Sequence, residues 1–317
     1  MPRVSVIIPV FNAASTVAAA IESVLAQTFT DFEIIAIDNG SIDRSREVLA
    51  RYADRVKILE EPKRGPSAAR NAGVRASSGE YLGFLDADDW WRPTMLERTV
   101  QTLDGDPDCV LVYTDLALVD STGREQMASL VGDSHPPTVD EMLERLWPIL
   151  PSGVVMRRRA FELAGGFPEA LTAFEDVYLW LRAREHGNFH YLAEPLAVWR
   201  FALFPEPLKP GGGQEEAGVV FERMVRERYG VSAHRHVVAR RRAPRSILGY
   251  IGLRALREGD RTLARRAFAR AIRFDPLRIK NYLRLARTIL PDAMARALPP
   301  RGSNRCRRTW AVRGESP

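Results

Sequence analysis

The segment Tyr81-Leu82-Gly83-Phe84-Leu85-Asp86-Ala87-Asp88-Asp89 joins an apolar run to three carboxylates within four positions. The apolar part predicts a buried β-strand, and the acidic part falls where that strand ends. Carboxylates this close repel one another and resist burial, so a cation is expected to compensate them. Mg²⁺ suits such a place because it prefers one or two protein carboxylates together with substrate phosphates. A polar turn after the strand is the simpler alternative, since Asp is frequent in turns.

Length and composition allow one large domain or two smaller ones, since 45% of the 317 residues are hydrophobic. No apolar run is long enough to cross a membrane, and the start, Met1-Pro2-Arg3-Val4, lacks the layout of a signal peptide, so a cytoplasmic location is expected. Cys109 and Cys306 lie far apart, which argues against a disulfide framework or a thiolate metal site.

The formal net charge of +6 is unevenly distributed. From Arg235 to Pro317, 22 Lys and Arg face 5 Asp and Glu, whereas residues 1–234 carry 24 basic and 35 acidic side chains. These counts give +17 and −11, and they predict an acidic body with a basic extension that meets an anionic partner. Peripheral contact with an anionic membrane is expected; an acidic protein or a solvated helix face without a partner is the alternative. Nucleic acid is disfavoured because aromatic residues rarely interleave the arginines.

Apolar runs alternate with helical patterns through the first part of the chain, which predicts an α/β fold with a mostly parallel sheet and helices on both faces. In such sheets ligands bind beyond the carboxyl ends of the strands, so Asn12, Asp38 and Asp86 are expected to converge on one crevice. The expected strands are residues 4–10, 32–37, 56–59 and 81–85, and the expected helices are 15–27, 43–52 and a helix entered from the loop at 65–73.

The remainder is less regular. A strand is expected at 110–113, ending at Asp115, followed by a strand at 154–156, a short helix at 159–164 and a helix that opens at Phe174-Glu175-Asp176. Residues 247–290 predict three short helices that resemble one tetratricopeptide-type hairpin and a further helix. The predicted divisions are 1–115 and 116–215 (two halves of one domain), 216–245 (linker or helix), 246–298 (basic helical segment) and 299–317 (disordered tail).

Motifs in this order resemble those of the family-2 inverting glycosyltransferases, which have the GT-A fold of nucleotide-diphospho-sugar transferases; here a small C-terminal helical segment is added. The similarity covers roughly residues 3–200; each motif is weak alone, but together, at spacings like those of the family, they are a strong signal. The resemblance implies that residues 1–115 form the nucleotide-sugar-binding half of the domain and residues 116–215 the acceptor-binding half. The motifs are Val6–Asn12, Asp38–Asp43, Gly65–Gly73 and Phe84–Asp89, together with Glu175–Arg182, which resembles the acidic acceptor-site motif of the family.

The donor site is expected at the first two motifs. Asp38 can accept a hydrogen bond from a nucleobase N–H, a role that the resemblance also implies, although an Asx-turn or a helix cap would explain it too. Asn39 stands where the family usually has a second Asp, which is expected to alter ribose or base contacts without abolishing binding. Pro9, Phe11 and Asn12 are expected to form a wall beside the base and ribose, unless Pro9 merely ends a strand.

The cation and the diphosphate are expected near Arg70 and the acidic cluster. Arg70 can supply a cationic fork near the nucleotide or its phosphates, with a surface ion pair as the alternative. Asp86, Ala87 and Asp88 resemble the DXD motif of the family, which implies that Asp88 binds Mg²⁺ or Mn²⁺ directly. Asp86 is then expected to contact the ribose or a water bound to the metal, and Ala87 is expected beside the donor. Asp89 is expected to orient Asp86 and Asp88 without binding the metal itself. The cation would neutralise the departing diphosphate.

Inversion requires a base that reaches the acceptor hydroxyl on the face opposite the leaving phosphate. The resemblance points to Asp176 as that base and to Glu175 as the residue that holds the acceptor or tunes the base. Two carboxylates at a helix start could instead complement the helix dipole. The expected reaction is a single displacement, moving a hexose-type unit from a nucleotide-diphosphate donor to a saccharide or lipid-linked acceptor in cell-envelope polysaccharide biosynthesis.

Two other functions remain open from the sequence. A nucleotidyltransferase that makes nucleotide sugars has a similar sheet and a metal-binding Asp, but it normally begins with a glycine-rich phosphate loop that residues 9–12 do not supply. A non-catalytic GT-A-like module that recruits membrane or protein would be favoured by loss of an acidic motif, yet both acidic motifs are present.

Overall fold

The structure, a computed structural model, divides into an N-terminal unit, Met1–Arg242, and a C-terminal unit, Ala243–Pro317. Within them it describes residues 1–119, 125–127, 135–144, 149–200, 213–232, 252–253, 255–256, 260–274 and 279–289. None of the helices in these ranges is both long enough and apolar enough to span a bilayer.

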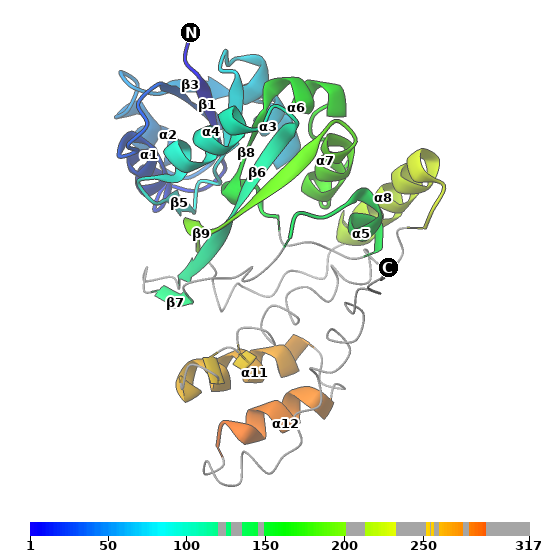
Figure 1. Ribbon diagram of the computed structural model, residues 1–317. Helices are drawn as coiled ribbons and strands as arrows, with labels where there is room; N and C mark the ends of the chain where they lie inside the picture. The colour runs from blue at the N-terminus through cyan, green and yellow to red at the C-terminus, as the bar shows by residue number, and fades with distance from the viewer. Residues whose placement is uncertain are drawn as a thin grey trace, which may run out of the picture. The chain divides into compact units, whose positions relative to one another are not determined.

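One sheet of nine strands organises the N-terminal unit (Figure 1). Its order is β3-β2-β1-β4-β8-β6-β9-β5, with β7 paired to β6. The first four strands in this order are mutually parallel, β8 is antiparallel to both β4 and β6, and β6 and β9 are parallel. The strands are β1 (Val4–Val10), β2 (Phe32–Asp38), β3 (Lys57–Glu60), β4 (Tyr81–Phe84), β5 (Trp90–Trp91), β6 (Cys109–Val119), β7 (Glu125–Met127), β8 (Val154–Arg157) and β9 (Asn188–Arg200).

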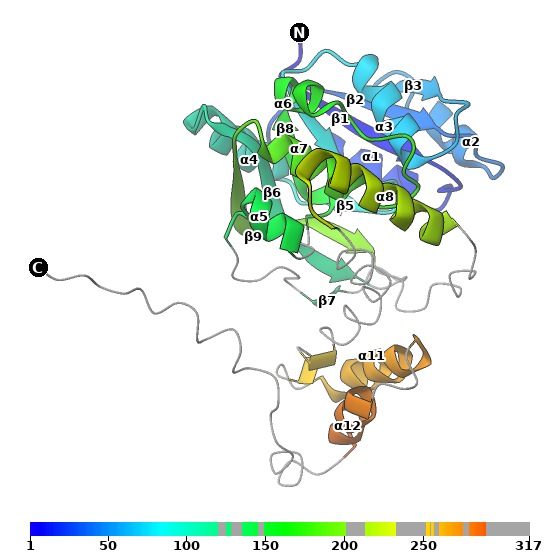
Figure 2. The same cartoon turned by 90° about the vertical axis from the view of Figure 1, so that its right-hand side faces the viewer.

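Helices cover both faces of this sheet, as expected (Figures 1 and 2). One hydrophobic core includes side chains of α1, α2 and α4, and a second includes side chains of α3, α6, α7 and α8. The helices are α1 (Val17–Leu25), α2 (Ser45–Ala50), α3 (Pro66–Arg75), α4 (Met95–Gly105), α5 (Val139–Glu144), α6 (Arg158–Ala164), α7 (Glu175–Arg184) and α8 (Gly213–Tyr229).

The central strand β1 is apolar on both sides because each side contributes to a core. Ile7 belongs to the core with α3, whereas Val6 and Ile8 belong to the core with α1. Gly73 brings α3 close to the sheet: a Cβ atom at this position would lie 2.6 Å from the side chains of Ile7 and Ile37. This close approach fixes the height of α3, and therefore of Arg70 within it, above the strands.

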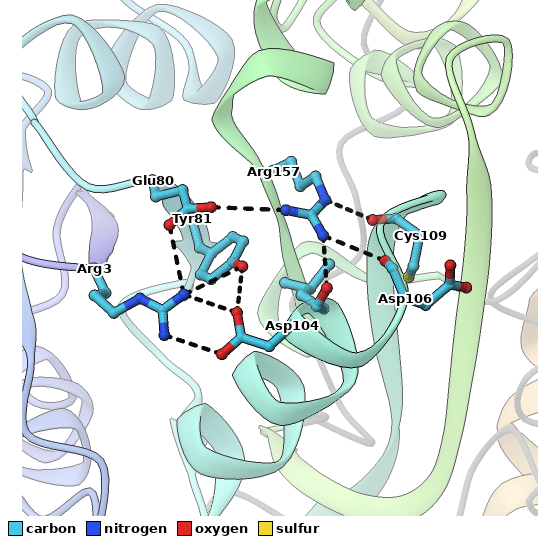
Figure 3. A network of polar contacts seen from close by, with 8 residues as sticks. Arg3, Glu80, Tyr81, Asp104, Asp106, Cys109 and Arg157 are labelled. Carbon is cyan, nitrogen blue, oxygen red and sulfur yellow. Dashed lines mark hydrogen bonds and ion pairs between the residues drawn. The ribbon is translucent and has the colours of Figure 1, made fainter.

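A polar network joins the starts of the strands at the edge opposite the ends of β1, β2 and β4 (Figure 3). Both terminal nitrogens of Arg3 donate to Asp104 of α4, at 3.0 and 2.7 Å, and the Tyr81 hydroxyl donates to the same carboxylate at 2.6 Å. Arg157, at the end of β8, donates to the carbonyl oxygens of Leu103 and Cys109. The network therefore ties β4 and β8 to α4, away from the predicted site.

Some boundaries differ from those predicted. β6 continues past Asp115 to Val119, because Asp115 is buried within the ladder and its carboxylate accepts a hydrogen bond from the N–H of Leu116. The sequence did not predict α4, β5 or β9. Residues 201–212 of the predicted acceptor half and the predicted tail from residue 299 lie outside the described residues.

Two helices are described in the C-terminal unit, α11 (Arg261–Phe274) and α12 (Ile279–Arg287). Ala264, Ala267, Phe268 and Ala271 are completely buried, so α11 provides the core of this pair. Two shorter stretches, 252–253 and 255–256, are also helical, and Gly252 lies against the ring of Phe268.

Candidate functional site

Asn12 and Asp38, two of the predicted site residues, lie close together because β1 and β2 are adjacent and parallel. In the register of β1 and β2, Val10 faces Asp38, and β4 lies on the other side of β1. Asn12, in the left-handed region at φ 50°, follows β1 and accepts a hydrogen bond from the N–H of Ile42 at 2.9 Å. Its own N–H donates to the Ser41 hydroxyl at 3.0 Å. Asn12 thus holds the ends of β1 and β2 together at the predicted edge.

Asp38 is buried and both of its carboxylate oxygens already accept hydrogen bonds. Arg46 Nε donates to one at 2.7 Å, and the N–H of Ser41 donates to the other at 3.2 Å. Burial raises the pKa of Asp38, but the hydrogen bonds from Ser41 and Arg46 outweigh it and hold this pKa below the ordinary value. Only 1% of the side chain is exposed, so a nucleobase N–H reaches this carboxylate only if Ser41 or Arg46 moves.

Asn39 uses its amide as a brace for the chain that leads into α3. The NH₂ group donates to the carbonyl oxygens of Glu61 and Lys63 at 2.8 and 2.7 Å, while the amide oxygen accepts from the N–H of Gly65 at 2.8 Å. An Asp cannot donate to either carbonyl. The departure from the usual family residue therefore has a local structural cause.

Phe11 is exposed beside this edge. Its ring is 54% exposed, and the Arg64 guanidinium lies over it with 5.1 Å between the guanidinium carbon and the ring centroid. Arg64 also packs on Gly40, where a Cβ atom would lie 2.8 Å from that carbon. Pro9 is half-buried inside β1, which continues to Val10, so Pro9 does not end the strand.

Arg70 connects the two acidic motifs. It is only 4% exposed, and its Nη2 donates to Asp86 Oδ1 at 2.6 Å while its Nη1 donates to Glu175 Oε1 at 3.4 Å. Its guanidinium also lies over the Phe167 ring. Burial lowers the pKa of Arg70, but the charges of Asp86, Glu175 and Asp176 raise it above its ordinary value. Arg70 is therefore a buried ionic centre and not a surface ion pair.

The other two carboxylates of the acidic cluster differ in exposure: Asp88 is exposed and Asp89 is buried. Ala87 packs into a core, and Asp88 is exposed; among the described residues its carboxylate makes no side-chain hydrogen bond. Asp89 is buried and accepts hydrogen bonds from the Ser152 hydroxyl at 2.5 Å and from the N–H of Arg200 at 3.0 Å. Desolvation and the negative charge of Asp86 raise the pKa of Asp88, and more strongly that of Asp89.

The second acidic motif begins α7 in a strained geometry. Phe174 adopts φ 68°, a left-handed conformation that costs an aromatic residue free energy. Its ring stacks on Phe221 of α8 at 4.8 Å, which holds this conformation. Glu175 and Asp176 follow, only 8% and 7% exposed, and both contribute to the electrostatic environment of Arg70. The second acidic motif therefore lies beside the first.

The oxygen donors of this cluster fit a hard divalent cation that arrives with a diphosphate. Among the described residues, no three side chains of His, Cys, Asp or Glu form a complete metal site. Asp86 is partly exposed and bonded to Arg70 through one oxygen, and Asp89 is buried and bonded to Ser152, so Asp88 is the most accessible carboxylate of the three. Mg²⁺ and Mn²⁺ accept such incomplete protein sites because substrate phosphates and water complete the coordination. The raised pKa values of Asp88 and Asp89 mark negative charge that a cation would compensate.

Three residues were missed from the sequence. Ser152 accepts a hydrogen bond from the N–H of Asp86 at 3.1 Å and donates to Asp89, so it fixes the acidic turn. Arg200 donates from Nε to the carbonyl oxygen of Asp88 at 3.2 Å, and Arg46 binds Asp38. Pro151-Ser152-Gly153 forms a 3₁₀ turn before β8, and a proline–glycine turn that leads into a strand was the only available signal.

Comparisons with known proteins agree with this geometry. The family model described as "Glycosyl transferase family 2" matches residues 5–163. A curated "Uncharacterized glycosyltransferase" of Nostoc sp. is 36% identical over 47% of this chain and 54% of its own length. Another from Rickettsia felis is 29% identical over 71% and 38%, and a chondroitin synthase of Escherichia coli is 29% identical over 61% and 28%. The chain thus spans about half or less of these relatives.

Solved structures share the fold at low identity. TarS of S. aureus in complex with UDP gives a TM-score of 0.54 at 16% identity, over 90% of each chain. The mannosyltransferase PcManGT from Pyrobaculum calidifontis in complex with GDP-Man and Mn²⁺ gives 0.51 at 19% identity, over 94% of this chain and 78% of that one. The family model matches half of the chain, and the chain therefore belongs to glycosyl transferase family 2.

Proposed function

We propose that this enzyme transfers a hexose-type unit from a nucleoside-diphosphate donor to a hydroxyl of a saccharide or lipid-linked acceptor, with inversion and with a divalent cation. The observation that carries the proposal is the position of Arg70 between Asp86 and Glu175, with Asp176 close enough to act on its charge. That position supports the proposal because it brings Asp86, of the motif expected to bind the donor, close to Glu175, of the motif expected to bind the acceptor. TarS was solved with UDP-GlcNAc and PcManGT with GDP-Man, which supports a nucleotide-sugar donor here.

Each group then has a distinct task. Asp88 holds the cation, which when bound supplies Lewis-acid stabilisation of the departing diphosphate. Asp176 accepts the proton of the acceptor hydroxyl as its oxygen attacks the anomeric carbon. Arg70 positions Asp86 and Glu175, so it acts through them. Phe11 and Asn12 bind the nucleoside beyond the ends of β1 and β2, and Asp38 joins them once Ser41 or Arg46 moves. The bond from sugar to phosphate breaks as the new glycosidic bond forms.

The direct test is hydrolysis or transfer with a panel of nucleotide sugars and Mn²⁺. The proposal predicts turnover of one donor class, lost on chelation and restored by Mn²⁺ or Mg²⁺. Formation of a nucleotide sugar from a sugar phosphate and a nucleoside triphosphate would indicate a nucleotidyltransferase, and donor binding without turnover under any condition would indicate a binding module. A cell-envelope acceptor and a basic C-terminal region held at the inner face of the cell membrane complete the proposal.

A further inference from the structure

Helix α12 exposes several of its apolar residues and buries the side chain of Asn281. Ile279, Tyr282 and Leu283 are 72%, 46% and 53% exposed, and Ile289, just after the helix, is 64% exposed. Their spacing puts them on one face of the helix. Asn281 and Thr288 are each only 1% exposed. A helix on the surface of a soluble domain normally has the reverse arrangement.

The inward side gains little from its polar residues. In the part of the chain that the structure describes, neither the oxygen nor the nitrogen of the Asn281 amide has a hydrogen-bond partner. The Thr288 hydroxyl donates to the carbonyl oxygen of Leu285 within its own turn, at 2.7 Å. An unpaired buried amide costs free energy, because it has lost its water partners. The buried polar side of α12 therefore does not compensate the free-energy cost of exposing its apolar face. This imbalance points to an external partner that covers the apolar face.

The charge around this face defines the partner. α11 and α12 together contain seven arginines, one lysine and no acidic residue. Arg287 lies one turn beyond Leu283 and therefore borders the apolar face. An exposed aromatic and aliphatic face on such a basic pair of helices is typical of helices that lie in the interface of anionic membranes. A second copy of this chain would bring the same positive charge against it and be repelled.

We infer that the apolar face of α12, formed by Ile279, Tyr282, Leu283 and Ile289, inserts into the interfacial layer of a membrane that contains anionic phospholipid. Arg287 then contacts a lipid phosphate. This inference deepens the membrane contact of the proposed function, since it names the surface responsible. Insertion of the apolar side chains gives hydrophobic free energy in proportion to the area removed from water, and the arginines add an electrostatic attraction that salt screens.

The test is flotation of the full chain with vesicles of phosphatidylcholine and phosphatidylglycerol, compared with vesicles of phosphatidylcholine alone. The double variant Tyr282→Ser/Leu283→Ser is expected to lower partition into the anionic vesicles at least about tenfold, and binding to the neutral vesicles is expected to be weak throughout. A matched control is Leu163→Ser/Val219→Ser, which removes side chains that are 49% and 70% exposed on α6 and α8. This control is expected to float like the unsubstituted chain.

Donor hydrolysis and light scattering separate the other outcomes. Both double variants are expected to be monomers and to hydrolyse the donor normally. If no protein, including the unsubstituted chain, hydrolyses the donor but flotation still depends on α12, the proposed reaction is rejected and the membrane inference stands. Equal flotation of the Tyr282→Ser/Leu283→Ser variant and the control would overturn the inference. The apolar face of α12 would then be covered by the chain itself or remain in water. A dimer of the unsubstituted chain that this variant dissociates would also overturn it, in favour of a second copy.

Discussion

Arg70 Nη2 lies 2.6 Å from Asp86 Oδ1, and this pair joins the helix behind the sheet to the acidic turn after β4. The Arg70 side chain is 5% exposed and the Asp86 side chain 35%, so the pair joins the protein interior to the solvent-exposed surface. Because the same guanidinium reaches Glu175 at the start of α7, one buried cation sets the relative positions of two acidic motifs that are far apart in the sequence.

Replacement of Arg70 by Met is expected to destabilise the fold by about 3 kcal/mol, because it leaves the buried Glu175 carboxylate and the partly exposed Asp86 carboxylate without their cation. Arg98→Met is the matched control: Arg98 lies 2.6 Å from Glu194, the same distance, but both side chains are more than 40% exposed. That exposed pair should contribute no more than about 1 kcal/mol. Urea unfolding measures both variants, and equal losses would contradict the role assigned to the buried pair.

Arg70→Lys keeps the charge but loses the fork that reaches two carboxylates at once. Turnover is expected to fall about 100-fold through misplacement of the acidic groups, while the protein stays folded. Steady-state kinetics with the best donor of the panel measures this effect. Wild-type turnover in Arg70→Lys would show that a simple positive charge suffices at this position.

Asn39→Asp introduces the residue more usual in the family, yet it is expected to destabilise this chain by about 2 kcal/mol. The carboxylate would face the carbonyl oxygens of Glu61 and Lys63, which now accept hydrogen bonds from the amide. Thermal unfolding should show a fall of a few degrees, roughly 2–4 °C for each kcal/mol in a domain of this size. An unchanged or higher midpoint would mean that the loop rearranges around the new carboxylate at no cost.

Ser152→Ala is expected to weaken the response to Mn²⁺ by about tenfold to 100-fold, because hydrogen bonds orient the carboxylates at a metal site. It removes the donor to Asp89 and the acceptor of the Asp86 N–H. Ser5→Ala is a matched control, since buried Ser5 donates to Glu33 and accepts from the N–H of Gly79. Titration of activity with Mn²⁺ compares the two, and an equal shift in both would indicate a general loss of stability.

Stability at alkaline pH is expected to depend on Tyr81. Burial and the hydrogen bond to Asp104 raise the pKa of Tyr81 from 10.0 to about 12. The folded state therefore favours the protonated hydroxyl, so its contribution is complete below pH 10 and is lost as the pH rises toward 12. The difference in unfolding free energy between the unsubstituted protein and Tyr81→Phe, followed by chemical denaturation, should shrink across this interval. A constant difference would contradict the linkage.

Local patterns predicted the parallel strands and the place of the site, because β-branched runs such as Val4–Val10 and the Asp residues that follow them act through short-range geometry. The pattern failed at β9, where Pro195 and polar residues interrupt the apolar alternation and pairing with distant β6 determines the strand. Asp115 was read as a strand end because Asp favours turns, but burial and the Leu116 N–H satisfy it inside β6.

Site geometry was predictable in part for the same reason. The residues after β1, β2 and β4 lie at one edge, as parallel pairing requires. The buried bridge from Arg70 to Glu175, and the link from Ser152 to Asp89, depend on how segments far apart in the chain pack together. No spacing within a single segment contains that information. The roles of Asp88 and Asp176 stay predictions that only chemistry can test.

The most direct measurement of the central claim compares donor binding and turnover in Asp88→Ala and Asp176→Asn by calorimetry and steady-state kinetics in the presence of Mn²⁺. The account predicts that Asp88→Ala loses donor affinity, whereas Asp176→Asn binds the donor like the unsubstituted enzyme and loses turnover by about 100-fold or more. Full turnover in Asp176→Asn, or unchanged donor affinity in Asp88→Ala, would contradict it.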